Sequence, residues 1–293
     1  MEVSWVPLTL LCAFALASAD AATKAWLRDL SASELVVVRF GIPGLLLTPL
    51  LGGLPPLSGL PLTFWGWLAV MVPLELGAMW LYMAAIRDHP LSLTLPYLAF
   101  TPVFVIGGAW MLLGERVSAQ GAAGVLLVVA GAWVLNSGHA RWREWRSWGL
   151  PFAAILYEPG SRMMLAVAAI YAVTATLGKG AMRHLPPETF GAFYFALLGL
   201  VVLVLIVLPR PQVLHKLAVR PWPVLAVGAL TGLMVYTHFL ALQQVEVAYM
   251  IAVKRVSLLF GILYGAWLFG EAGLITKLPA GLLMLIGVLL ILL

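Results

Sequence analysis

Charged side chains are scarce in this chain of 293 residues. Asp, Glu, Lys and Arg together make up 10% of the sequence, whereas soluble domains contain about 25% of these residues. A soluble globular enzyme is therefore excluded. No long stretch of the chain has the composition of a soluble extramembrane domain either.

Cysteine and catalytic motifs are almost as scarce. Cys12 is the one cysteine, which excludes disulfides within the chain. The three aspartates, Asp20, Asp29 and Asp88, do not form an Asp-rich metal motif, and HExxH, GxSxG and CxxC patterns do not occur. We therefore predict that the protein is not an enzyme and has no metal and no cofactor. A membrane enzyme built on other acid–base pairs is the less favoured alternative.

Apolar residues are abundant. They make up 63% of the chain, and the mean hydropathy is +1.03. At about 20 residues per membrane-spanning helix, the apolar runs predict an all-α integral membrane protein with ten transmembrane helices and the lipid bilayer as its partner. The predicted spans are 5–27, 34–51, 64–86, 91–113, 118–136, 162–183, 188–208, 223–244, 247–269 and 274–292. The pI near 9.5 does not indicate nucleic-acid binding, because the sequence has no dense Lys/Arg stripe.

Two motifs occur twice, in the same order and 155 to 157 residues apart. Lys24-x3-Arg28-x-Leu30 ends the first predicted span, and Lys179-x3-Arg183-x-Leu185 ends the sixth. Gly-Ala-Trp followed by Gly-Glu ends the fourth and the ninth. Because five is odd, the second copy enters the membrane from the opposite face, and such inverted repeats are a hallmark of alternating-access transporters. We predict one five-helix repeat in residues 1–136, a connecting loop in 137–161 and a second repeat in 162–293.

The loop charges predict an orientation. Loops on the face away from both termini contain ten Lys or Arg residues, and the other face contains Arg116 and Arg183. The ten are Arg28, Arg87, Arg141, Arg143, Arg146, Arg162, Arg210, Lys216, Arg220 and Lys277. Because basic loops remain cytoplasmic, we predict that both termini lie outside.

Three ionisable side chains lie near the cytoplasmic ends of the first two predicted spans. Arg39 is about 8 Å inside the membrane at 1.5 Å per residue, and Asp20 and Lys24 lie at comparable positions on the first span. We interpret Asp20 and Arg39 as a structural ion pair, with Lys24 extending toward the headgroups. A role of these residues in coupling transport to an ion is the alternative.

A second group of ionisable side chains is predicted near the outer face. Lys254 and Arg255 lie about 11–12 Å inside the membrane and His238 about 9 Å, with Lys179 nearby and Glu75 as the one carboxylate at similar depth. Each unpaired cation in a membrane costs about 2.5–3.5 kcal/mol. We therefore expect a water-lined cavity whose missing counter-ion is an anionic substrate. The alternatives are that the basic side chains pair with Glu75 or extend to the membrane surface, and that Glu75 or His238 carries a proton.

At these positions the chain resembles the EamA-type ten-helix carriers of the drug/metabolite transporter superfamily. The stretch from Pro90 to Pro102, which contains Tyr97, is typical of the fourth helix in a bacterial EamA group. The run from Lys254 through Arg255 to Ser257 is typical of its ninth helix and is similar to that of triose-phosphate translocators, where the basic pair binds the substrate phosphate. The resemblance carries the substrate-binding role over to Lys254 and Arg255 alone, and it implies a location in the bacterial inner membrane. Most relatives are thought to keep both termini inside, opposite to the loop charges.

Together these features predict a secondary transporter that moves a small organic anion, which could be a phosphorylated metabolite, across the membrane by alternating access. The predicted substrate-binding residues are Lys254, Arg255, Lys179, His238, Glu75, Tyr97 and Ser257. Export of an amino acid or another neutral or zwitterionic metabolite is the alternative, and lipid flipping is less favoured. A monomer and a homodimer fit the sequence equally well.

Overall fold

The regular secondary structure is helical throughout the part of the chain that the computed structural model describes, which is residues 4–89, 95–136, 157–269 and 274–293. The first half contains α1 Trp5–Trp26, α2 Ala32–Leu46, η1 Thr48–Gly53, η2 Leu57–Gly59, α3 Leu62–Asp88, η3 Leu95–Phe100, α5 Thr101–Leu113 and α6 Ala119–Asn136. The second half contains α8 Pro159–Ala181, η5 Met182–His184, α9 Pro187–Val202, η6 Leu203–Val207, α10 Gln212–Ala218, α11 Pro221–Gln244, α12 Val247–Lys254, α13 Ser257–Phe269 and α14 Leu274–Leu292.

Six helical segments of the described residues are long and apolar enough to cross a membrane. They are Trp5–Trp26, Leu62–Asp88, Pro159–His184, Pro187–Val207, Pro221–Gln244 and Val247–Leu268. Three shorter apolar helices accompany them, Tyr97–Leu113, Ala119–Val134 and Pro279–Leu292. Large apolar side chains such as Met111, Leu205 and Trp267 point outward, as the lipid-facing surface of a membrane protein requires. The chain is thus a multi-pass membrane protein.

The structure departs from the predicted elements in several places. The predicted helix 34–51 is α-helical only to Leu46, after which a 3₁₀ segment runs from Thr48 to Gly53. The predicted span 247–269 is interrupted between α12 and α13. The loop predicted after residue 208 contains the short helix α10. Of the predicted connecting loop 137–161, residues 137–156 lie outside the described residues, and α8 begins at Pro159.

Helix α2 has a well-defined start, which sets the position of Arg39 two turns later. Ser31 and Glu34 form a capping box, in which the Ser31 Oγ accepts from the Glu34 N–H at 3.3 Å and Glu34 Oε2 accepts from the Ser31 N–H at 2.7 Å. This arrangement satisfies two backbone donors that would otherwise have no partner. Lys216 of α10 then pairs with Glu34 at 2.7 Å, so the short helix fastens the start of α2.

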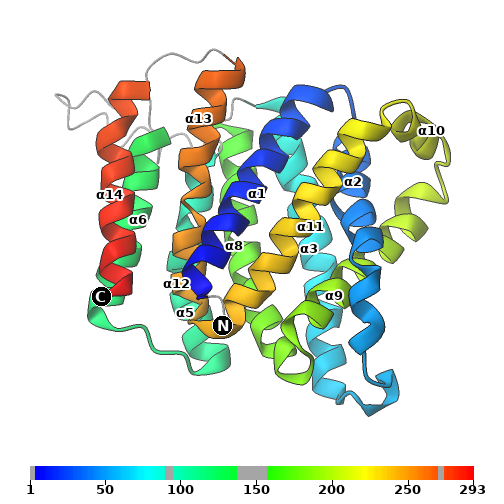
Figure 1. Ribbon diagram of the computed structural model, residues 1–293, viewed down its shortest axis with the longest axis horizontal. Helices are drawn as coiled ribbons and strands as arrows, with labels where there is room; N and C mark the ends of the chain where they lie inside the picture. The colour runs from blue at the N-terminus through cyan, green and yellow to red at the C-terminus, as the bar shows by residue number, and fades with distance from the viewer. Residues whose placement is uncertain (1–3, 90–94, 137–156, 270–273) are drawn as a thin grey trace.

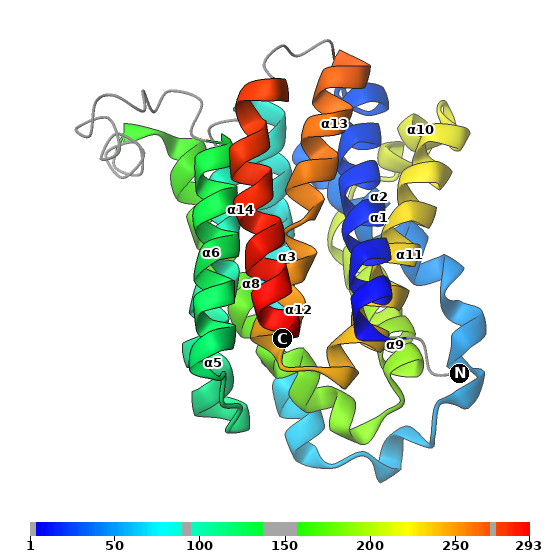
Figure 2. The same cartoon turned by 60° about the vertical axis from the view of Figure 1, so that its left-hand side comes forward.

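The contacts between the two halves come in corresponding pairs. If each helix is replaced by its counterpart in the other half, the same helices remain neighbours. Helix α1 packs against α11, and its counterpart α8 packs against α3. Helix α1 also packs against α13, as α8 does against α5, while α2 meets α9 and α6 meets α14. Figure 1 shows the α6–α14 pair at one flank of the bundle and α2 and α10 at the other. The start of α1 and the end of α14 lie at the same end of the bundle (Figures 1 and 2).

Glycines allow the closest helix contacts, as is common between transmembrane helices. A Cβ placed on Gly287 of α14 would lie 2.7 Å from the Gly124 carbonyl oxygen of α6. A Cβ on Gly44 of α2 would lie 2.5 Å from the Phe195 carbonyl oxygen of α9. Both distances are too short for a carbon–oxygen contact, so these two interfaces require residues without side chains.

We expect Gly287→Ala to destabilise the protein by about 1–3 kcal/mol, because the added methyl group forces α14 away from α6. Gly66→Ala is the matched control, since a Cβ at Gly66 of α3 meets nothing within 4 Å and both substitutions gain the same helix propensity. Thermal unfolding of the purified variants in detergent measures the difference. Equal melting temperatures for the two variants would contradict the close α6–α14 contact.

Candidate functional site

A cavity of about 130 Å³ lies between the two halves of the chain. Helices α1, α2 and α3, together with η3 and α5, line it from the first half, and α8, α9, α11 and α12 line it from the second. Its polar lining residues are Arg39, Glu75, Tyr82, Thr101, Tyr171, Thr174, Tyr194, Thr231, His238, Lys254 and Arg255. Polar groups from both halves thus converge inside an apolar bundle.

An interruption between α12 and α13 shapes one wall of this cavity. Lys254 is the last residue of α12, and Arg255 lies in the turn before α13 begins at Ser257. The Arg255 N–H donates to the Ala252 carbonyl and the Val256 N–H to the Val253 carbonyl, both at 3.0 Å, so the chain here has the tighter i→i−3 pattern. The fourth apolar segment changes in the same way from η3 to α5 at Thr101. Interrupted helices at corresponding places in two halves are typical of transporter binding sites.

Among the described residues, the groups next to the Lys254 ammonium are an imidazole ring and a thioether sulfur, not carboxylates. Its Nζ lies 3.4 Å from His238 Nδ1 and 3.6 Å from Met234 Sδ, both on α11. Because an ammonium group can only donate, His238 Nδ1 is the acceptor in this contact. Glu75 of α3 is the one acid in the described lining of the cavity, which also includes Lys254 and Thr174 of α8. The structure therefore brings three predicted site residues, Lys254, His238 and Glu75, to one cavity.

Arg255 is the least compensated charge in the cavity. The side chain is buried, with a relative exposure of 6% for the residue, and it forms no ion pair with the acids that the structure describes. Its Nε is one of three buried side-chain polar atoms without a hydrogen-bond partner in the described residues; the others are Arg39 Nε and Tyr194 Oη. All three residues line the same cavity. Buried polar groups are nearly always hydrogen-bonded in native proteins, so these atoms make the cavity the candidate binding site.

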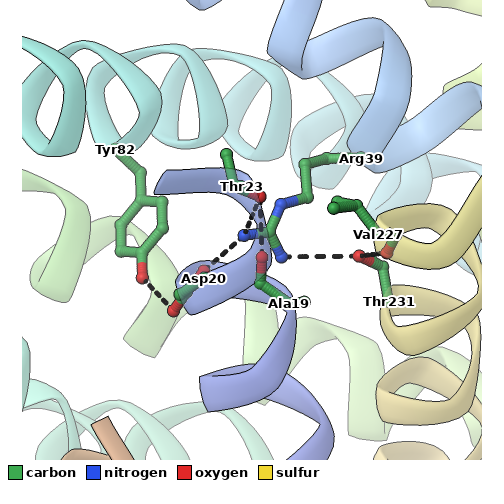
Figure 3. A network of polar contacts seen from close by, with 7 residues as sticks. All are labelled: Ala19, Asp20, Thr23, Arg39, Tyr82, Val227 and Thr231. Carbon is green, nitrogen blue, oxygen red and sulfur yellow. Dashed lines mark hydrogen bonds and ion pairs between the residues drawn. The ribbon is translucent and has the colours of Figure 1, made fainter. Parts of the chain in front are cut away.

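Arg39 is held by a polar network that joins the two halves (Figure 3). Its Nη2 pairs with the Asp20 carboxylate of α1 and donates to Thr23 Oγ1 at 3.2 Å. Its Nη1 donates to Thr231 Oγ1 of α11 at 3.4 Å. The Tyr82 hydroxyl of α3 donates to Asp20 Oδ2 at 2.7 Å. The structure thus places the expected partners Asp20 and Arg39 in contact and adds Tyr82 and Thr231 to them.

Lys179 lies elsewhere than the depth estimate placed it. Its Nζ is 2.6 Å from Glu115 Oε1, just after α5, and donates to the Val245 carbonyl at 2.6 Å. Glu115 Oε2 accepts from the Val247 N–H at the start of α12, at 2.9 Å. This network joins the end of α5, the end of α8 and the start of α12. Glu115 is therefore the counter-ion of Lys179. Lys179 is not among the described lining residues of the cavity.

The described cavity lining also lacks four other predicted residues, which are Asp20, Tyr97, Ser257 and Lys24. The Tyr97 ring packs edge-on against Trp133 of α6, with ring centroids 5.6 Å apart. Ser257 is buried as the first residue of α13, and Lys24 lies partly exposed in the last turn of α1. Tyr97 and Ser257 are predicted substrate-binding residues, but both lie next to the described lining, at or near the interrupted helices. The second Gly-Glu motif, at 270–271, falls outside the described residues.

Several lining residues were not predicted from the sequence, although helical spacing contains a signal for them. Met79 and Tyr82 lie four and seven residues after the predicted Glu75 on α3, and Tyr171 and Thr174 lie three residues apart on α8. Side chains at these spacings share one helix face. Polar residues aligned in this way on otherwise apolar helices would have indicated the cavity without the structure.

Comparisons with known proteins concern the chain as a whole. The model of the EamA-like transporter family matches residues 3–137 and, a second time, residues 159–293. Comparison with curated protein sequences gives no match. Among solved structures, a crystal structure described without a function is similar over 99% of this chain and 98% of its own, with 17% identity and a TM-score of 0.71. At this identity the likeness shows the fold alone.

We expect Lys179→Gln to lower the free energy of unfolding by about 1–3 kcal/mol, because the partly buried Glu115 carboxylate loses its charged hydrogen bond. Removing both charges together, in Lys179→Gln with Glu115→Gln, should cost less than the sum of the two single changes. Thermal unfolding of the four proteins measures this coupling. Additive effects of the two changes would show that the pair contributes nothing to stability.

Proposed function

Because the chain belongs to the EamA-like transporter family, we propose a specific task for this membrane transporter: it moves a small organic anion across the bilayer by alternating access. This family lies within the drug/metabolite transporter superfamily, and its members are transporters. The cavity between the two halves is the proposed binding site, with Lys254 and Arg255 binding the anion and His238 positioning Lys254. A bacterial inner membrane is the proposed location.

The observation that carries the proposal is the set of unpaired buried polar atoms around the cavity. Arg255 Nε and Arg39 Nε can only donate hydrogen bonds, and the Tyr194 hydroxyl can donate as well. A ligand that satisfies these atoms must supply acceptor oxygens. Next to an uncompensated guanidinium, an anionic acceptor forms hydrogen bonds about twice as strong as a neutral one. An organic anion therefore fits this cavity better than a neutral sugar or a cation.

The arrangement of the helices supports alternating access. The contacts of α1 with α11 and of α8 with α3 correspond to one another when the halves are exchanged, which favours two inverted five-helix repeats and ten transmembrane segments in all. The cavity lies between these halves, and interrupted segments from each half line it. Rocking of one half against the other would then open the cavity first to one side of the membrane and next to the other. The loop charges favour an orientation with both termini outside.

A zwitterionic metabolite is the second candidate, and Glu75 is the observation that favours it. This carboxylate lines the same cavity as Lys254 and Arg255. An amino acid could place its carboxylate at Arg255 and its ammonium group at Glu75. The anion remains the first choice because Glu75 already shares the cavity with the cation of Lys254.

The test is transport by purified protein in liposomes, with lactate, phenylacetate, glycerol 3-phosphate, leucine and glucose as separate radiolabelled probes. We expect uptake of at least one of the three anions above that of protein-free liposomes. Arg255→Ala and Lys254→Ala should abolish this uptake, and Arg255→Lys should reduce it about tenfold or more, because lysine keeps the charge but loses the planar fork of donors. Arg87→Gln is the control that removes a positive charge far from the cavity, at an exposed pair with Asp88.

Uptake of leucine or glucose alone would contradict the anion proposal, as would the failure of all three anions. Normal uptake by both alanine variants would show that the basic pair is structural. Leucine uptake that is lost in Glu75→Gln but not in Arg87→Gln would support the zwitterion instead.

A further inference from the structure

We propose that the anion bound in this cavity is a monocarboxylate with an apolar body, such as an arylacetate, and that its carboxylate pairs with Arg255. The inference rests on the proposed function, since it concerns the same cavity and the same transport. It goes further by setting the charge of the ligand and the character of its uncharged part. The charge of the ligand follows from the charged residues around the cavity. The character of its uncharged part follows from the apolar residues that line the cavity.

The charges around the cavity leave one positive charge uncompensated. Arg39 is paired with Asp20. Lys254 lines the cavity together with Glu75, the one acid in its described lining, and His238 adds no charge while it accepts from Lys254. Arg255 has no carboxylate partner in the part of the chain that the structure describes. A ligand with a net charge of −1 balances this cavity, whereas a dianion would bring a surplus negative charge into a low-dielectric bundle, which is costly.

The shape of the Arg255 side chain favours a planar ligand group. A guanidinium presents its donors in a rigid fork that matches the two oxygens of a carboxylate. The Nε of Arg255 has no acceptor among the described residues, so a carboxylate that reaches this edge of the fork competes with no protein group. The Tyr171 hydroxyl lines the same cavity as Arg255, and a phenol can donate to a carboxylate without competing for the guanidinium as an acid would.

The rest of the lining favours an apolar body. Met71 and Met79 of α3, Met234 and Phe239 of α11, Phe195 of α9 and Ile251 of α12 all line the cavity. A polyhydroxylated body would lose its hydrogen bonds to water against such a surface. Methionine side chains are flexible and polarisable and pack well against aromatic rings. An aryl or branched alkyl group therefore suits this surface better than a sugar or a glycerol backbone.

The experiment is calorimetric binding of a matched aryl series to the purified protein in detergent at pH 8. The probes are phenylacetate (charge −1), phenyl phosphate, which is mostly a dianion at this pH, 2-phenylacetamide (neutral) and phenylalanine (zwitterion). We expect phenylacetate to bind about tenfold or more tightly than each of the other three, which corresponds to about 1.4 kcal/mol. In Arg255→Gln this preference should disappear, and in Arg87→Gln it should persist.

Glu75→Gln gives the sharpest check, because it changes the charge count without touching Arg255. Removal of this acid leaves two uncompensated positive charges, so the affinity for phenyl phosphate relative to phenylacetate should rise about tenfold or more. Arg255→Lys, which retains the charge, should bind phenylacetate more weakly but still prefer it to 2-phenylacetamide. These two variants keep the test decisive if Arg255→Gln does not fold.

Two failures are distinguishable. If phenyl phosphate binds more tightly than phenylacetate to the unmodified protein, or if Glu75→Gln leaves their ratio unchanged, the charge count is wrong while transport of another anion stands. If neither anion binds better than 2-phenylacetamide and phenylalanine, the monocarboxylate assignment and the anionic site fall together.

Discussion

A positive charge inside a membrane bundle needs an anion, and this requirement organises the polar residues of the chain. Lys and Arg cost several kcal/mol at membrane depth unless they are paired or reach water. Arg39 has Asp20, Lys179 has Glu115, and Lys216 at the bundle end has Glu34. The two members of each pair come from separate parts of the bundle. Each ion pair therefore neutralises a charge and also holds two elements together. Arg255 lines the cavity and has no such acid partner among the described residues.

The interruption between α12 and α13 lies at the two cations of the cavity. Lys254 ends α12, Arg255 follows it in the turn, and both side chains line the same space. The Lys179–Glu115 network fastens the start of α12 through the Val247 N–H. The polar contacts outside the cavity thereby position the helix that carries the two cations.

Much of the fold follows from the sequence because a membrane imposes simple rules. Apolar length and the two repeated motifs predict an all-helical membrane protein in two halves, and the EamA-like family model matches both halves. The depth of a charge along its helix predicts that Asp20 can reach Arg39. Depth says nothing about the direction in which a side chain points around its helix. For that reason depth alone groups Lys179 with Lys254 and Arg255, whereas the structure pairs it with Glu115 just after α5. The turn at Arg255 was also beyond prediction, since no proline or glycine marks it.

The central claim is that the uncompensated Arg255 holds the carboxylate of the transported anion. A crystal structure with 4-bromophenylacetate tests it most directly, because the anomalous signal of bromine locates the ligand without prior assumptions. The account predicts a bromine peak among the methionine and phenylalanine side chains of the cavity, with the carboxylate in contact with the Arg255 guanidinium. A bromine peak at the lipid-facing surface, or a carboxylate bound to Lys179 or Arg39 and not to Arg255, would contradict it.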